Sequence, residues 1–163
     1  MKKVGIIMGS DSDLPVVEKA IDALKDLEVP YEVHVYSAHR TPDETRAFAA
    51  NARANGFGAI IAAAGMAAHL AGAIAAGTTL PVIGIPVKGS FDGMDALLST
   101  VQMPGGIPVA TVAVNGAKNA ALLACEIISV SDTEMADKLD EMRKEGAQAV
   151  LQKNKEIEKK YNI

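Results

Sequence analysis

The sequence predicts an α/β fold built on a doubly wound parallel sheet. Five short apolar segments alternate with five segments of helical character, and this alternation is typical of parallel strands joined by right-handed crossovers. Most of the apolar segments are continuously apolar rather than alternating, as expected of strands covered on both faces. At 163 residues the chain is expected to form a single domain, with an α/β core (1–130) and a helical tail (131–163).

The positions of these segments give the elements in chain order. The predicted order is strand 4–8, helix 14–27, strand 33–36, helix 42–55, strand 59–63, helix 67–76, strand 82–87, helix 93–101, strand 109–114 and helix 117–128. Helix 42–55 has the clearest start, because Thr41 and Glu44 match a T-x-x-E capping box and Pro42 suits the first helical position. Ala and Gly are frequent and Trp is absent, so small side chains are expected to bring helices and sheet close together.

The tail differs from the core in composition. Residues 132–163 are highly charged with both signs mixed, and their apolar residues recur at helical spacing. The predicted apolar stripe consists of Met135, Leu139 and Met142, continued beyond a helix-weakening Gly146 by Val150, Leu151 and Ile157. Two interpretations stay open: the tail packs on its own domain, or it reaches over a neighbouring subunit.

The composition excludes several classes of protein. Hydrophobic residues make up 49% and charged residues 22%, which is typical of a globular protein, and a net charge of −4 argues against nucleic-acid binding. The single cysteine, Cys125, excludes an internal disulfide, lies in an Ala-rich run where burial is expected, and suits a reducing compartment. Asp11 and Asp13 interrupt the first apolar run, and no run reaches the roughly 20 apolar residues of a membrane span. We expect a cytoplasmic protein that binds no membrane.

Three polar loops follow the first three predicted strands. In open parallel sheets, ligands bind beyond the carboxyl ends of the strands, so these loops are expected to share one site. The first, residues 9–13 (Gly-Ser-Asp-Ser-Asp), could hold an anion with its hydroxyls and backbone N–H groups, while Asp13 accepts hydrogen bonds from ribose. The alternative is that Ser12 or Asp13 only caps the following helix. The loop matches neither the dinucleotide-binding nor the ATP-binding glycine pattern.

The second loop carries the strongest chemical signal. Residues 37–40 (Ser-Ala-His-Arg) place His39 beside Arg40 just before a helix, where an imidazole can move a proton and a guanidinium can grip a phosphate. The alternatives are a surface salt bridge for Arg40 and a capping or packed role for His39. A titrating group beside an anion clamp is what an enzyme acting on a phosphorylated metabolite needs.

The third loop is harder to interpret. Residues 64–70 (Ala-Gly-Met-Ala-Ala-His-Leu) could expose backbone N–H groups and leave room for a flat ring, or could simply allow tight packing. Residues 102–108 are either a connector or a loop that closes a site or meets another subunit. A metal site is not expected, because the three histidines and the single cysteine lack the usual ligand spacing.

These segments together resemble the 5-(carboxyamino)imidazole ribonucleotide mutase family of purine biosynthesis, also known as the catalytic subunit of bacterial-type phosphoribosylaminoimidazole carboxylase. The resemblance extends through Ile128 and depends on five segments in the same order. They are residues 9–13, 37–43, 67–70, 80–84 and 101–106. One departure is Ala71, which stands where the family usually has the proline of His-Leu-Pro-Gly, and which could loosen the turn after His69.

The resemblance implies a flavodoxin-like, three-layer αβα fold and a homo-octamer that uses neither metal nor organic cofactor. It also implies that a carboxyl group moves from the exocyclic nitrogen of 5-carboxyaminoimidazole ribonucleotide to a ring carbon, with His39 as the proton-transfer residue. The implied substrate contacts are Ser10, Ser37 and Arg40 for the phosphate, Asp13 for the ribose, Ala64, Gly65, His69 and Leu70 around the base and carboxylate, and Ala38.

Other functions remain to be separated from this one. The nearest is direct carboxylation of aminoimidazole ribonucleotide by free CO2, as in animal-type relatives, although the His69-Leu70 segment favours the mutase. A non-catalytic nucleotide sensor would use the same three loops but needs no titrating group beside the anion clamp. A flavin-binding electron carrier would need aromatic rings, of which the chain has few.

Overall fold

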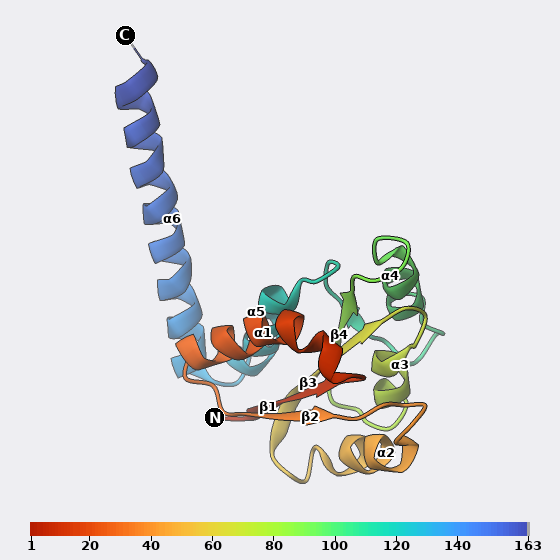
Figure 1. Ribbon diagram of the computed structural model, residues 1–163. Helices are drawn as coiled ribbons and strands as arrows, with labels where there is room; N and C mark the ends of the chain where they lie inside the picture. The colour runs from red at the N-terminus through yellow and green to blue at the C-terminus, as the bar shows by residue number, and fades with distance from the viewer. Residues whose placement is uncertain (163) are drawn as a thin grey trace.

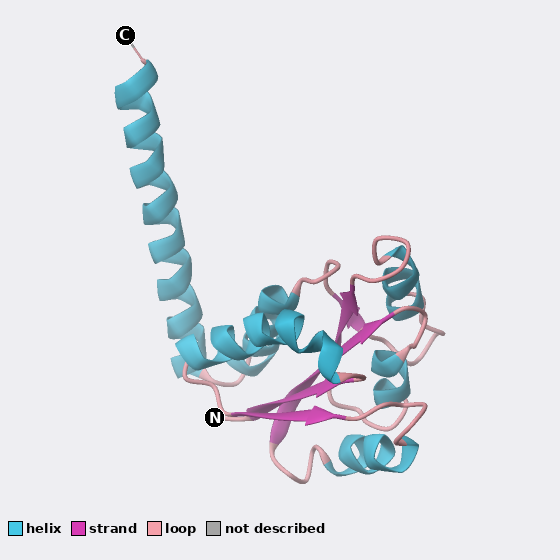
Figure 2. Cartoon of the chain, viewed as in Figure 1, coloured by secondary structure: helices cyan, strands magenta, loops and turns pink. Residues whose placement is uncertain are grey.

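The computed structural model describes residues 1–162, in which a parallel five-stranded sheet lies between two layers of helices (Figures 1 and 2). The strand order across the sheet is β2-β1-β3-β4-β5, and all neighbouring strands run parallel. This is the order of the flavodoxin-like doubly wound fold. The predicted fold class is therefore confirmed.

Every predicted strand and helix forms, with changes at some ends. The strands are β1 (Lys3–Met8), β2 (Tyr31–Val35), β3 (Phe57–Gly65), β4 (Val82–Val87) and β5 (Ala110–Thr111). The helices are a 3-10 turn η1 (Asp11–Asp13), α1 (Leu14–Asp26), α2 (Pro42–Asn51), α3 (Leu70–Ala75), α4 (Met94–Val101), α5 (Ala117–Ser129) and α6 (Thr133–Tyr161). Within residues 1–162, no helix is both long and apolar enough to cross a membrane.

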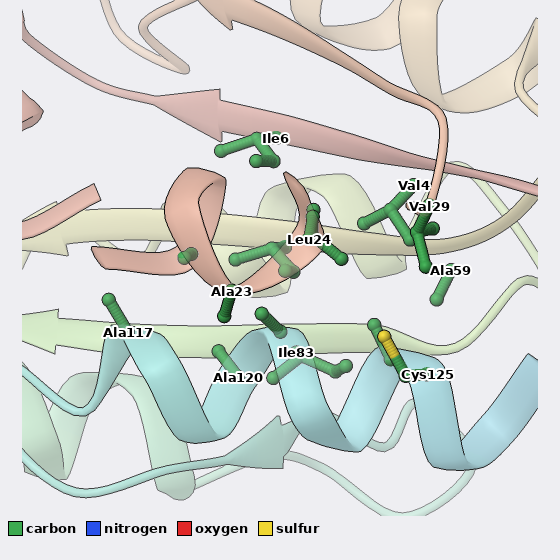
Figure 3. Close-up of a cluster of buried hydrophobic side chains, with 14 of the residues drawn as sticks. Val4, Ile6, Ala23, Leu24, Val29, Ala59, Ile83, Ala117, Ala120 and Cys125 are labelled. Atoms are coloured by element: carbon green, nitrogen blue, oxygen red, sulfur yellow. The ribbon is translucent and has the colours of Figure 1, made fainter. Parts of the chain in front are cut away.

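One face of the sheet is covered by α1 and α5 (Figure 3). Val4 and Ile6 of β1 are fully buried there with Leu24 of α1, and Ala120 of α5 lets that helix approach closely. Cys125 belongs to the same core and is fully buried, as predicted. Burial raises the pKa of its thiol to about 11, so the sulfur stays neutral and unreactive at physiological pH.

The opposite face is covered by α2, α3 and α4. Ile7 of β1 and Ile60 of β3 are buried there together with Ile74 of α3. At Gly84 of β4, an added Cβ would lie only 2.3 Å from Cγ2 of Thr100, so α4 packs directly on the strand because this position lacks a side chain. Small residues thus set the thickness of this layer, as the composition predicts.

The predicted capping box of α2 does not form. The helix begins at Pro42 with Thr41 at the N-cap position, as expected, but the Thr41 side chain makes no capping bond. Its hydroxyl instead accepts a hydrogen bond from the Ser37 amide at 2.8 Å and donates to the Ser37 carbonyl at 3.2 Å. The hydroxyl closes the preceding loop rather than capping the helix.

The tail forms one continuous helix, α6, that Gly146 does not interrupt. Its first half packs on the core, where Met135 and Leu139 are buried, and Lys138 contacts Glu28 at 2.8 Å. Its second half projects away from the rest of the molecule (Figure 1). The packed interpretation therefore holds for the first half only, and Ile163, the last residue of the predicted tail, lies outside the described residues.

Candidate functional site

The three polar loops meet at one edge of the sheet. Met8, at the end of β1, is in register with Val35 of β2 and Ala63 of β3, so the loops that follow begin side by side. Strand β2 lies on one side of β1 and β3 lies on the other, so the direction in which strands are added reverses after β2. This makes the β1/β3 boundary the switch point of the sheet. Ligands of doubly wound folds bind at that position.

A cavity of about 430 Å³ opens between the loops. Nine of the ten predicted site residues line it, and these are Ser10, Asp13, Ser37, Ala38, His39, Arg40, Ala64, Gly65 and Leu70. The tenth, His69, does not line it. The cavity is also bordered by Gly9, Ser12, Met66 and Ala68, which belong to the same three loops but were not among the predicted site residues. The structure thus brings the predicted residues together, while their individual roles stay predictions.

The β1 loop presents a hydroxyl pair and a buried carboxyl group. The Ser10 hydroxyl accepts hydrogen bonds from the amide of Ser12 at 3.3 Å and from its hydroxyl at 2.9 Å, and so caps η1. Asp13 occupies the N-cap position of α1 but its side chain makes no capping bond. Asp13 is only 8% exposed, and this burial raises the pKa of its carboxyl group. Capping therefore does not explain an aspartate at this position.

The β2 loop is a tight turn around Ser37. The Ser37 hydroxyl accepts hydrogen bonds from the backbone amides of His39 at 3.3 Å and Arg40 at 3.2 Å. The ring of His39 is exposed and hydrogen-bonds to no other residue within 1–162. Neither a capping nor a packed role accounts for this histidine.

Arg40 connects two of the loops. Its guanidinium Nη2 donates a hydrogen bond to the carbonyl oxygen of Gly9 at 3.0 Å. No carboxylate among the described residues forms an ion pair with it, so the predicted alternative of a surface salt bridge is not observed. Its remaining N–H groups are left for an anion.

The β3 loop supplies a small, largely apolar wall. Ala64 and Gly65 end β3 half-buried, and Leu70 is buried at the first position of α3. An added Cβ at Gly65 would meet only ordinary contacts, the nearest at 3.5 Å from the Val87 carbonyl oxygen, so packing alone does not require glycine there. The His69 ring turns toward α4, where its Nδ1 lies 2.5 Å from the carbonyl oxygen of Ser99. Its contact with substrate stays a prediction.

Cavities of similar volume elsewhere in the molecule have different chemistry, as two of them show. One of about 490 Å³ lies between α1, α5 and α6, where Lys138 is already paired with acidic side chains. The other, of about 450 Å³, lies at the start of β4 and is lined by Ile107 and Pro108 of the 102–108 loop. In one chain this loop therefore lies away from the β1/β3 cavity. Position and functional groups, not volume, single out the cavity at the switch point.

The arrangement suits a phosphorylated ring compound. Hydroxyls of Ser10 and Ser37 and the Arg40 guanidinium can bind a phosphate, and the Asp13 carboxylate can accept hydrogen bonds from sugar hydroxyls. His39 supplies a proton-transfer group on the same cavity. Within residues 1–162, no group of three His, Cys, Asp or Glu side chains is placed to hold a metal ion.

Comparison with known proteins gives one consistent result. The family model described as AIR carboxylase matches residues 3–149. The N5-carboxyaminoimidazole ribonucleotide mutase of Pyrococcus abyssi is 57% identical over 89% of this chain and 84% of its own. That of Thermotoga maritima is 52% identical over 97% and 93% of the two chains. The phosphoribosylaminoimidazole carboxylase of Saccharomyces cerevisiae is 53% identical over 95% of this chain but only 27% of its own length.

Solved structures extend the comparison to the fold. PurE of Treponema denticola superposes with a TM-score of 0.85 and 32% sequence identity, covering 98% of both chains. A variant of PurE2 from the same organism gives a TM-score of 0.85 and 31% identity over the full length of both chains. The similarity therefore includes the C-terminal helix as well as the α/β core.

Proposed function

The chain belongs to the AIR carboxylase family, and from that membership and the chemistry of its cavity we propose that it is an N5-carboxyaminoimidazole ribonucleotide mutase. Its reaction in purine biosynthesis would convert 5-carboxyaminoimidazole ribonucleotide into 4-carboxy-5-aminoimidazole ribonucleotide. The observation that carries the proposal is the gathering of nine predicted site residues around one cavity at the β1/β3 switch point.

Substrate binding divides the cavity into three parts. The phosphate binds Ser10, Ser37 and Arg40, where hydroxyls and a guanidinium offer donors to its oxygens. The ribose hydroxyls donate to the carboxyl group of Asp13, which has no capping bond to give up. The imidazole ring and its carboxylate lie beside Ala38, Ala64, Gly65 and Leu70, with His69 next to them in the chain.

The first step breaks the carbamate bond. His39, protonated, gives its proton to the exocyclic nitrogen of the substrate, which makes that nitrogen a better leaving group. The carbon–nitrogen bond then breaks with its electron pair going to nitrogen, and CO2 is released next to the ring. Small, apolar walls such as Ala64 and Gly65 hold a neutral molecule without offering a competing nucleophile.

The second step forms the carbon–carbon bond. The electron-rich ring carbon attacks CO2, and that carbon becomes tetrahedral with both a hydrogen and a carboxylate. His39, now neutral, removes the hydrogen as a proton, and the electron pair restores the aromatic ring. One imidazole thus serves first as acid and then as base, and it ends the cycle protonated as it began.

The proposal also covers the oligomeric state of the protein, its need for cofactors and its location in the cell. We infer a homo-octamer, supported by the exposed apolar residues on the projecting half of α6, which a neighbouring subunit would cover. Proton transfer and trapped CO2 complete the chemistry, so no metal ion or organic cofactor is needed. A cytoplasmic location agrees with the single, buried and unreactive Cys125.

The experiment that tests the proposal traces the source of the transferred carboxyl carbon with an isotope label. The enzyme is incubated with 5-carboxyaminoimidazole ribonucleotide in buffer containing ¹³C-bicarbonate, and product is detected by its ultraviolet absorbance and mass. A mutase yields product with little ¹³C, because the released CO2 stays in the site. A carboxylase, as the name of the yeast relative suggests, yields labelled product and also turns over aminoimidazole ribonucleotide with bicarbonate. If neither substrate gave product, both the mutase and the carboxylase assignment would be refuted.

A further inference from the structure

The residue that does not line the cavity has a contact of its own. His69 Nδ1 lies 2.5 Å from the carbonyl oxygen of Ser99 on α4. The hydroxyl of the same serine lies within hydrogen-bond distance of two carbonyl oxygens, that of Ala96 in its own helix at 3.1 Å and that of Met66 at 3.3 Å. Met66 and His69 both have left-handed backbones, with φ of 52° and 56°, and they bound the loop between β3 and α3. Ser99 therefore contacts both left-handed positions of a loop that borders the cavity, and its shorter contact is with His69.

The contact determines which nitrogen of the His69 ring carries the proton. A carbonyl oxygen can only accept a hydrogen bond, so Nδ1 must be the donor. In the neutral ring Nε2 then keeps a free lone pair, and it hydrogen-bonds to none of the residues in 1–162. Nε2 is thus the nitrogen left for a ligand, and it acts as an acceptor while the ring is neutral.

Gly72 provides the space that this ring occupies. A Cβ added at Gly72 would lie 2.0 Å from Nε2 and 2.2 Å from Cε1 of His69. Both distances are far below any contact that atoms tolerate, and the obstructing atoms belong to a ring that Ser99 holds in place. Any side chain at this position would push the imidazole off the Ser99 carbonyl.

We propose that Gly72 and the Ser99 carbonyl are positioning groups that hold His69 as the Nδ1–H tautomer and present Nε2 to the substrate. His69 stands in the chain between Ala68 and Leu70, which both line the cavity. A lone pair at Nε2 favours a substrate group that carries a hydrogen, and the exocyclic N–H of the proposed substrate and product is such a group. The ligand half of this inference rests on the proposed function, whereas the tautomer half does not.

Long-range ¹H–¹⁵N correlation spectra of the full chain test the tautomer directly. The chain has three histidines, and the signals that disappear in a His69→Asn variant are those of His69. At about pH 8.5, where an unperturbed imidazole is neutral, the wild-type spectrum should show the Nδ1–H pattern for His69. Ser99→Ala, which removes the hydroxyl but keeps the carbonyl, should preserve that pattern. Gly72→Ala should lose it and lower kcat/KM by about tenfold or more, because the ring is displaced.

The outcomes separate this inference from the proposed function. An Nε2–H pattern in the wild type, or unchanged His69 signals in a folded Gly72→Ala, would overturn the positioning role. Titration with 4-carboxy-5-aminoimidazole ribonucleotide should move the Nε2 signal while Nδ1 keeps its proton. Shifts at the amides of Gly9 and Ser10 without a shift at Nε2 would overturn the ligand half. If the nucleotide moved no signal at all, the proposed function would fail while the tautomer assignment stood.

Discussion

The guanidinium of Arg40 donates a hydrogen bond to the carbonyl oxygen of Gly9 at 3.0 Å, joining the loop after β2 to the loop after β1. The side chain expected to bind phosphate therefore also sets the distance between two walls of the cavity. Its other N–H groups have no carboxylate partner within residues 1–162. A phosphate entering this cavity meets a cation that is already positioned, which reduces the entropy lost on binding.

Replacing Arg40 with alanine should weaken substrate binding without unfolding the protein. A hydrogen bond to a charged group contributes about 1.5–3 kcal/mol, so KM should rise between about 10- and 150-fold. Steady-state kinetics and thermal melting measure the two effects. Arg46→Ala is the matched control, because Arg46 is an exposed arginine of α2 that pairs only with Asp43 among the described residues. An equal KM for the Arg40 variant and wild type would contradict the phosphate role.

Replacing Asp13 with asparagine should separate function from stability. Burial raises the pKa of this carboxyl group, so the folded protein binds its proton more tightly than the unfolded chain does. The stability contributed by this group is therefore full at low pH and falls as pH rises through the range above about 3.9. At neutral pH, Asp13→Asn should match or exceed the wild type in Tm, yet lose about tenfold or more in kcat/KM.

The control for this variant is Asp22→Asn, which changes an exposed aspartate of α1. It should alter neither Tm nor activity measurably. The difference in unfolding free energy between wild type and Asp13→Asn, measured from pH 3 to pH 7, gives the sign directly. A loss of several degrees in Tm with full activity would mean that Asp13 serves the helix rather than the site.

Replacing Ala71 with proline should stabilise the protein. Ala71 is the second residue of α3, and its backbone N–H donates to no acceptor within residues 1–162, so proline removes no hydrogen bond. Proline restricts the unfolded chain, and a gain of about 0.4–1 kcal/mol would raise Tm by about 1–4 °C. Ala73→Pro is the contrasting control, because the Ala73 amide donates to the His69 carbonyl at 3.1 Å. A lower Tm for Ala71→Pro would contradict this explanation.

Replacing apolar residues on the projecting half of α6 with charged ones should disrupt assembly. Val150 and Ile157 are 65% and 58% exposed in the single chain, although both continue the apolar stripe predicted from the sequence. The double variant Val150→Glu, Ile157→Glu should lower the mass found by light scattering below that of an octamer, while Lys153→Glu should not. A monomeric wild type, or an octameric double variant, would show that this stripe does not hold subunits together.

Much of this architecture could be predicted because the chain signals it locally. Continuous apolar runs identified β1, β3 and β4, and β-α alternation identified the sheet. Local patterns failed where tertiary contacts decide. Helix α3 starts at Leu70 rather than at residue 67, because Met66 and His69 adopt left-handed backbones, and Thr41 bonds to Ser37 instead of capping α2.

The candidate site shows the same division. The hydroxyls, imidazole and guanidinium that line the cavity stand out in the sequence by residue type. Ala68 and Met66 also line the cavity, but a small or flexible apolar residue is equally common in a cavity wall and in a hydrophobic core. Their residue types therefore did not indicate a site. The orientation of the His69 ring depends on Ser99, 30 residues away in the chain. A pattern of neighbouring residues therefore could not predict this orientation.

The most direct test of the central claim is turnover of 5-carboxyaminoimidazole ribonucleotide by a His39→Asn variant, followed by ultraviolet absorbance. Acid–base catalysis by a side chain contributes about 10²- to 10⁴-fold, so kcat should fall by at least about 100-fold. Product affinity should stay within about threefold, because the phosphate and ribose contacts remain. His34→Asn, which removes an imidazole of β2 outside the cavity, should keep its turnover. A His39→Asn variant that turns over as fast as wild type would contradict the claim that this imidazole moves the proton.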